Sequence, residues 1–468
     1  MIVQGLVLGA LVLGAVSPVT PVTPAPLTHT FTATMEHAID DLGARIVREK
    51  RSPGIAIGVV EDGRIVYAHG FGYADQATRR RVDPGTEFYI GETGRPFTAA
   101  ALLLLEQDGK LKLDDPVTKY VPELIVARGV TIRQLLDQTS GLPELSDVQG
   151  VPKDRTRTVK LATLIGLANK AKPDAPPGAR FENNDLNYLI AGLVVERASA
   201  VPLSDFLQQH IFIPLVMNQT FLAGDTGISA QHAVGYSGTP GRFARASSWN
   251  PAWLYGNADV VSTIYDLAKW DIGLPLLLRV DAERAMFTPA NVPGPNRYGL
   301  GWVIDERDGK RYIWQDGEIA GFHSMNALLP DDHIAVIVLA NTDAAHPRVV
   351  APEEVAARVI DIVAPPGKTR VDNAIVAKAR EWLERIAEKR IDRTQLTPAF
   401  SAYLTDELVA RADFAALGRP LAIVPISSRA GDGGDTVYEF LVRFPHEQYH
   451  YRLRIAADGK IDGLVLTP

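Results

Sequence analysis

Glu92 and Arg95 stand three residues apart, just before an apolar segment, at a spacing that lets an acid and a base act together. Apolar residues recur at helical spacing over 97–105, and Pro96 suits a first helical turn, so a helix is expected to begin here. At i and i+3 the two side chains can form an ion pair, and a carboxylate at a helix start interacts favourably with the helix dipole. If a second carboxylate lies nearby, Glu92 could also act as one member of an acid–base pair.

A second chemical motif, His446-Glu447-Gln448-Tyr449-His450, matches the zinc pattern His-Glu-x-x-His. Zinc binding by that pattern requires a helix, but residues 449–455 alternate as a strand, where positions i and i+4 lie about 13 Å apart. We therefore expect no metal at this motif and no cofactor. The chain has no cysteine, which removes thiol catalysis, disulfides and cysteine-ligated zinc.

The elements that must position these residues begin and end with strands. Gly54–Val60 and Arg64–His69 flank Asp62-Gly63 and predict a hairpin. Ser324–Leu329 and His333–Leu339 predict another antiparallel pair, and helices are expected between the two pairs. This order is typical of an antiparallel sheet completed by both ends of a domain, which gives an α/β (α+β) fold class.

The chain of 468 residues is too long for a single small domain. The segment Ala364-Pro365-Pro366-Gly367 is typical of a boundary between domains. We predict a main domain over 30–365 and a small α+β domain over 370–468, with a helix at Ala374–Lys389 and strands at Thr436–Phe444 and Tyr449–Ile455. The ending, residues 458–464, loosely resembles that of nuclear-transport-factor-2-like or cystatin-like modules.

Residues 1–17 are mostly apolar and too short to span a bilayer comfortably, which favours a signal peptide or, uncleaved, an N-terminal anchor. Residues 18–29 are Pro-rich and predict an extended tether. We expect a secreted or periplasmic protein whose membrane contact, if any, is this N-terminal segment. With 48 basic and 55 acidic residues the net charge is -7, which argues against nucleic acid as a partner.

Many short motifs occur in the order and spacing of one known family. They are Pro53-Gly54-Ile55-Ala56, Gly70-Phe71-Gly72-Tyr73-Ala74-Asp75, Phe88-Tyr89-Ile90-Gly91, Gly109-Lys110-Leu111-Lys112-Leu113-Asp114-Asp115-Pro116, Thr139-Ser140-Gly141-Leu142-Pro143, Pro177-Gly178-Ala179-Arg180-Phe181, Tyr298-Gly299-Leu300-Gly301-Trp302 and Leu339-Ala340-Asn341. Together they resemble the serine beta-lactamase and penicillin-binding-protein family, among its members the class C beta-lactamase-related serine hydrolases. The resemblance implies an antiparallel sheet flanked by helices, with an all-helical subdomain.

The family's nucleophilic Ser and its Lys base, spaced Ser-x-x-Lys, fall on Glu92 and Arg95 here. No Ser occurs between Ser52 and Ser140, so no shift of register restores the nucleophile. Arg stays protonated at ordinary pH and cannot act as the base. Thr93 is one residue out of register, and Ser140 is expected to be a turn residue.

Two further family motifs have lost their working side chains. Tyr-x-Asn falls on Asn183-Asn184-Asp185, and Lys/His-x-Gly falls on Gln315-Asp316-Gly317. The resemblance implies that these residues lie on a loop and a strand beside Glu92. Serine catalysis is therefore expected to be impaired.

The sequence is compatible with two arrangements of the side chains in the altered pocket. Glu92 and Arg95 could form a stabilising ion pair that fills it, or Glu92, Asp185, Gln315 and Glu318 could face one cavity that binds a cation, an amine or another ligand.

Three functions remain open. The protein could bind a small-molecule or cell-wall-derived ligand or a partner protein, it could hydrolyse an ester, amide or peptide through non-standard residues, or it could serve a structural role through its small C-terminal domain. No oligomeric state follows from the sequence.

Overall fold

A seven-stranded antiparallel sheet with the strand order β3-β2-β1-β12-β11-β10-β9 organises the chain. The computed structural model describes residues 31–467 except 225–228, 295–296, 345, 366–372, 412–416, 418–419, 421, 432–433 and 445–447. The strands of this sheet are β1 (Gly54–Glu61), β2 (Arg64–Asp75), β3 (Arg80–Arg81), β9 (Val303–Arg307), β10 (Lys310–Ile319), β11 (Phe322–Leu329) and β12 (Ile334–Ala340).

The sheet closes by pairing the first strand of the domain with the last. β1 pairs with β12, from Ile55 opposite Ala340 to Glu61 opposite Ile334. The predicted hairpin is confirmed, because β1 and β2 are joined by Asp62 and Gly63 with φ values of 49° and 71°. Two left-handed residues make the turn that suits the twist of paired strands. The predicted pairing of β11 with β12 is confirmed as well.

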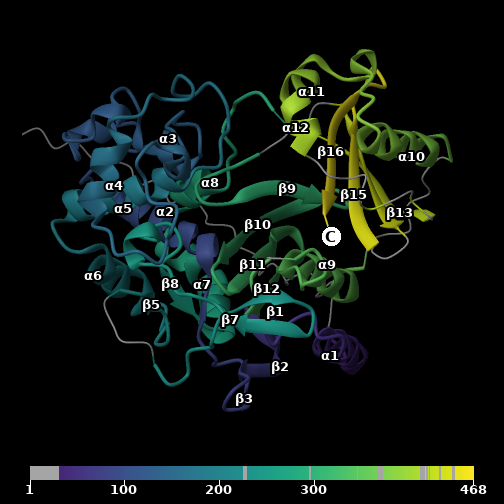
Figure 1. Cartoon of the computed structure of the whole chain (residues 1–468), viewed down its shortest axis with the longest axis horizontal. Coiled ribbons are helices and arrows are strands. Elements are labelled where there is room, and N and C mark those ends of the chain that lie inside the picture. The colour runs from purple at the N-terminus through teal and green to yellow at the C-terminus, as the bar shows by residue number, and fades with distance from the viewer. Residues whose placement is uncertain are drawn as a thin grey trace, which may run out of the picture.

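A helical region covers the front face of the sheet. It contains α2 (Arg95–Gln107), α3 (Ile132–Leu136), α4 (Leu161–Ala168), α5 (Asp185–Ser199), α6 (Leu203–Leu207), α7 (Ile264–Leu277) and α8 (Val280–Met286), with short strands β4 (Phe88–Tyr89), β5 (Phe221–Leu222), β6 (Tyr236–Thr239), β7 (Arg242–Arg245) and β8 (Val260–Ser262). Helix α2 is buried along nearly its whole length, and its Phe97 ring lies 4.4 Å from that of Trp270. Figure 1 shows α2 surrounded by the other helices, which makes it a rigid base for the residues at its N-terminus.

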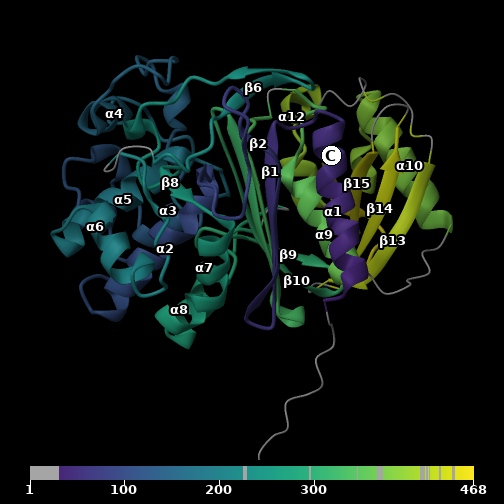
Figure 2. The ribbon, with the colours of Figure 1, turned by 90° about the horizontal axis from the view of Figure 1, so that it is seen from below.

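The back face is covered by α1 (Ala33–Arg48) and α9 (Pro352–Val363), which form a separate hydrophobic core with the sheet. Both helices are amphipathic, so each buries one apolar stripe and exposes the other side. In Figure 2 these two helices lie between the large sheet and the C-terminal part of the chain.

The C-terminal part folds around its own core. It contains α10 (Asn373–Ala387), α11 (Pro398–Tyr403), α12 (Asp406–Arg411) and a sheet of β13 (Ala422–Ala430), β14 (Thr436–Arg443), β15 (Gln448–Ile455) and β16 (Ile461–Thr467). Trp382 of α10 and Phe440 of β14 are fully buried in that core. The predicted helix and both predicted strands are confirmed, with ends that differ by one or two residues.

Three predicted features fall partly or wholly outside the described residues. The predicted signal peptide or anchor over 1–17 and the tether over 18–29 lie outside them, as do His446 and Glu447 of the zinc-like motif. His450 lies on strand β15, opposite Leu441, where the zinc pattern would need a helix.

Among the described helices, none alone has the length and apolar composition needed to cross a bilayer. α5 and the segment Leu203–Phe212 meet that criterion as a pair, and they are bent by 77° relative to each other.

Candidate functional site

Glu92 and Arg95 lie where strand β10 presses against the start of α2. Glu92 belongs to a 3-10 turn, Gly91–Gly94, and Arg95 is the first residue of α2. Gly317 of β10 makes the contact possible, since a Cβ there would lie 2.1 Å from the Ile90 carbonyl oxygen and 2.6 Å from the Glu92 nitrogen. This close approach explains why Gly317 remains although its family motif is otherwise lost.

The Arg95 guanidinium is buried and held by three different residues. Its Nε donates to Asn257 Oδ1 at 2.7 Å, Nη1 donates to Asn183 Oδ1 at 2.7 Å and Nη2 donates to Asp185 Oδ1 at 2.9 Å. Its Cζ also lies 5.2 Å from the centre of the Tyr188 ring, within cation–π range. The side chain is only 2% exposed, so Arg95 fills the interior of the site.

The predicted ion pair between Glu92 and Arg95 is wrong. The three Arg95 nitrogens donate to Asn257, Asn183 and Asp185, and Glu92 Oε2 instead accepts the backbone N–H of Glu318 at 2.8 Å. The pairing fails because Asn257, Asn183 and Asp185 take the Arg95 donors, while Glu92 turns to the backbone of β10.

Burial and the nearby charge of Asp185 raise the pKa of Glu92 to about 7. The charge of Arg95 and hydrogen bonds from the backbone N–H groups of Glu318 and of Glu92 itself oppose that rise. Two backbone N–H groups that converge on one oxyanion form the arrangement that stabilises negative charge in acyl-transfer sites. Here a carboxylate of the protein itself accepts the Glu318 N–H.

Asn183 and Asp185 both reach Arg95, from either side of a helix start. Asn184 caps helix α5 by accepting the backbone N–H of Leu186 at 2.8 Å. Asp185 therefore occupies the first turn of α5 instead of the loop implied by the resemblance, and Asn183 and the cap residue Asn184 precede the helix. The backbone N–H of Asp185 donates to Glu144 Oε2 at 2.9 Å. Burial and the charge of Asp185 raise the pKa of Glu144.

Gln315 and Glu318 lie on β10, but their side chains leave opposite faces of the strand. Gln315 is 3% exposed and accepts the hydroxyl of Tyr298 at 2.9 Å on the front face. Glu318 Oε1 accepts the backbone N–H of Ala344 at 2.9 Å. The expectation that the Glu318 carboxylate faces the same cavity as Glu92 is wrong, because side chains alternate along a strand and Glu318 contributes its backbone N–H.

The hydroxyl groups around the site already have hydrogen-bond partners. Thr93 Oγ1 lies 2.8 Å from Ser324 Oγ and 3.2 Å from the Gln315 carbonyl oxygen. Ser140 is 1% exposed, and its hydroxyl donates to Asn187 Oδ1 at 2.5 Å. The Tyr188 hydroxyl donates to the Leu136 carbonyl oxygen at 2.6 Å.

The sequence did not point to three residues that complete the site. Asn257 binds both Arg95 and Asp185, Glu144 receives the Asp185 backbone N–H, and Tyr298 orients Gln315. Asn257 is 162 residues from Arg95, and no local pattern marks it. Tyr298 lies in the family motif Tyr298–Trp302, which is the sequence signal that marks this position.

A central antiparallel sheet, a helical region in front of it and a polar site at the N-terminus of a buried helix define the beta-lactamase and transpeptidase fold. The chain belongs to the beta-lactamase family, whose model matches residues 30–359. "Protein flp" of Staphylococcus aureus (strain MW2) is 26% identical over 320 residues, which cover 65% of this chain and 63% of that protein. The chain thus spans less than two thirds of the length of that relative.

Solved structures show the same fold. An octameric penicillin-binding protein homologue from Pyrococcus abyssi is 19% identical with a TM-score of 0.63, and the match covers 92% of this chain and 98% of that one. D-amino acid amidase from Ochrobactrum anthropi SV3 is 23% identical with a TM-score of 0.63, over 71% and 99% of the two chains. The first match extends well past residue 365, into the C-terminal part of this chain.

Proposed function

We propose that this protein is a beta-lactamase-family member without serine hydrolase activity that binds a ligand in the altered pocket. The observation that carries the proposal is the Glu92 carboxylate, which accepts the Glu318 N–H at the position of the lost nucleophile. An acyl oxyanion would need that donor, so a serine-type reaction has neither a nucleophile nor a free place for the developing charge.

The charges of the pocket favour a cationic ligand. Arg95 supplies one positive charge, and Asp185 pairs with it directly at 2.9 Å. Glu92 and Glu144 are two further carboxyl groups close enough to Asp185 for its charge to raise their pKa values. The Asp185 side chain is 30% exposed and therefore reachable from solvent. An ammonium group, as in an amine-bearing cell-wall fragment, would complement this surplus of carboxylates.

Covalent labelling tests the loss of serine chemistry. The full chain is incubated with a beta-lactam and with a fluorophosphonate, and its mass is measured alongside esterase and D-amino-acid amidase assays. We expect no adduct and no turnover above buffer. A stoichiometric acyl adduct would overturn the proposal.

A second candidate function has one observation in its favour. The pKa of Glu92, near 7, suits a general base, which works best near the operating pH. In that case Glu92 would activate water against an ester or amide. Turnover in the same assays that disappears in Glu92→Gln, with the wild-type fold retained by circular dichroism, would establish this hydrolase and exclude the binding-only function.

Ligand binding itself is tested by thermal shift with small amines and with amine-bearing peptidoglycan fragments. A ligand that raises the Tm of the wild type, but not that of Asp185→Asn, supports the pocket. Glu182→Gln is the matched control, because Glu182 lies on the same loop and pairs with Arg180 instead of Arg95.

A further inference from the structure

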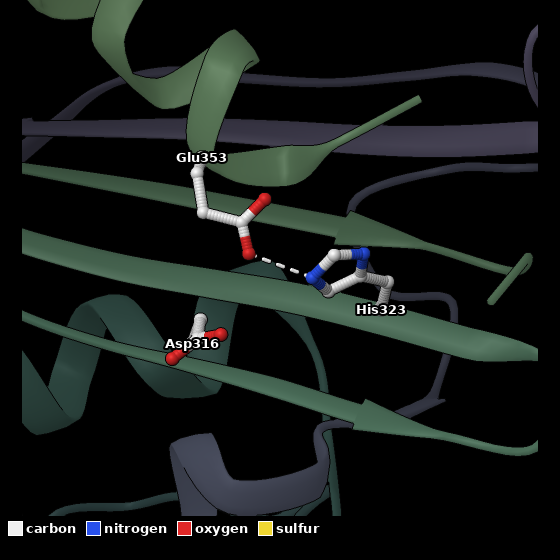
Figure 3. A group of neighbouring side chains, drawn as sticks. All are labelled: Asp316, His323 and Glu353. Atoms are coloured by element: carbon white, nitrogen blue, oxygen red, sulfur yellow. Dashed lines mark hydrogen bonds and ion pairs between the residues drawn. The ribbon is translucent and has the colours of Figure 1, made fainter. Parts of the chain in front are cut away.

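Asp316, His323 and Glu353 meet on the back face of the large sheet, away from Glu92 and Arg95. Asp316 comes from β10, His323 from β11 and Glu353 from the first turn of α9, as Figure 3 shows. Asp316 belongs to the Gln315-Asp316-Gly317 motif, but alternation along the strand turns its side chain to the face opposite Gln315. The three residues are not part of the site described above.

The three side chains are close enough to share one ion. His323 Nε2 lies 2.7 Å from Glu353 Oε1, and one ligand atom from each of the three residues lies within 4.8 Å of the others. The His323 side chain is 7% exposed and that of Glu353 is 24% exposed. In the described part of the chain, no hydrogen bond from another residue's side chain or backbone to the Asp316 carboxylate is found.

The charge of the group is negative even when His323 is protonated. Asp316 and Glu353 carry two carboxylates, and Glu318 is a third whose charge acts on His323. Arg95 also acts on Asp316, but from the other side of the sheet. Three carboxylates against the His323 imidazolium and Arg95 leave a net negative charge in a largely buried place, where uncompensated charge is costly.

We propose that Asp316, His323 and Glu353 bind a divalent transition-metal ion, best fitted by zinc. Zinc takes one imidazole nitrogen at about 2.0–2.1 Å and carboxylate oxygens at about 2.0–2.2 Å, usually in tetrahedral sites. Such ligands stand about 3.3 Å apart, so His323 and Glu353 would separate slightly as the ion replaces the proton between them. Two carboxylates would neutralise the ion, and a fourth position would be left for solvent.

A cavity lies beside one residue of this group. Glu353 lines a cavity of about 290 Å³ between the large sheet and the C-terminal sheet, together with Trp314 and Met325. Trp314 and Met325 lie two residues along their strands from Asp316 and His323, on the same face. An ion bound by Glu353 would therefore lie next to this cavity.

Direct metal binding tests the proposal. The untagged full chain is stripped with a chelator, and Zn²⁺, Mn²⁺, Mg²⁺ and Ca²⁺ are titrated by calorimetry, with metal content checked by mass spectrometry after dialysis. We expect one Zn²⁺ per chain and much weaker Mg²⁺ and Ca²⁺ binding, because an imidazole ligand favours zinc. His323→Gln and Asp316→Asn should each lower zinc affinity by at least about tenfold.

His450→Gln is the matched control, because His450 lines the same cavity and belongs to the zinc-like sequence motif, but not to the group of three. It should bind zinc as the wild type does. The proposal is overturned if the wild type binds no stoichiometric zinc, if both His323→Gln and Asp316→Asn bind it with wild-type affinity, or if only His450→Gln loses it. Circular dichroism confirms that each variant is folded, and Asp316→Asn decides the matter should His323→Gln not fold.

Discussion

Arg95 stands at the position of the family's catalytic base and holds three neighbouring side chains together. Its buried guanidinium donates to Asn257, Asn183 and Asp185, and removing it would take one hydrogen bond from a carboxylate and from each of two amides. We expect Arg95→Ala to lower the free energy of unfolding by about 3–5 kcal/mol, the cost of breaking a buried pair. Arg95→Lys should recover only part of it, because an ammonium cannot reproduce the fork of three contacts.

Urea denaturation measures this effect, with Arg133→Ala as the control. Arg133 pairs with Asp114 at the surface, where both side chains are well exposed. Arg133→Ala should therefore lower the free energy of unfolding by less than about 1 kcal/mol. Equal losses from the two alanine variants would contradict a structural role for Arg95.

At the residue scale, the sequence predicted which positions meet but not how they pair. Glu92, Arg95, Asn183, Asp185 and Gln315 could be placed together because family motifs on both sides set their register. Their bonds depend on Asn257 and on a 3-10 turn, features that arise from tertiary packing and leave no periodic signal.

At the element scale, a buried carboxyl group joins α7 to β11. Asn326 Nδ2 donates to Asp271 Oδ1 at 2.7 Å, and Asp271 Oδ2 and Asn326 Oδ1 have no partner in the described part of the chain. Burial raises the pKa of Asp271 to about 8. A carboxyl group whose pKa is higher in the folded than in the unfolded state binds protons more tightly when folded, so its contribution to stability is lost as pH rises.

We expect Asp271→Asn to raise the Tm at pH 9. The rise should be about 2–4 °C for each kcal/mol by which the variant increases the free energy of unfolding. Its amide can donate to Asn326 Oδ1 while still accepting from Asn326 Nδ2. The pH window runs from the pKa of an unfolded Asp, about 4, to the pKa of Asp271 in the folded protein, about 8. Between these values wild-type stability should fall relative to the variant, and below about pH 4 the difference should vanish. Calorimetry across this range checks it, and an equal Tm difference at pH 3.5 and pH 9 would contradict the titration of Asp271.

The strands and helices were the most predictable feature of this chain. The Asp62-Gly63 turn and the apolar runs around it fix a hairpin locally, and α2 follows from its apolar spacing and Pro96. The back-face group of Asp316, His323 and Glu353 escaped prediction because its members come from three elements, 7 and 30 residues apart, that only the folded sheet brings together.

At the scale of the whole molecule, an ion pair crosses between the two parts of the chain. Arg452 of β15 binds Asp305 of β9, and it also lies 3.2 Å from Glu439 within its own sheet. The side chains of Arg452 and Asp305 are 24% and 17% exposed, so this pair is less screened than a surface pair. It lies beside the cavity between the two sheets and joins the C-terminal part to the edge strand of the large sheet.

We expect Arg452→Ala to uncouple the two parts, because interfaces between domains of one chain are small and depend on few contacts. Scanning calorimetry should change from one unfolding transition to two, with the interaction weakened by about 1–3 kcal/mol. Arg454→Ala is the control, because Arg454 lines the same cavity but pairs with Asp435 inside the C-terminal part. The double variant of Arg452→Ala with Asp305→Ala should cost less than the sum of the single variants, because each single variant already removes the shared ion pair. Additive losses, or two transitions in Arg454→Ala alone, would show that other contacts hold the two parts together.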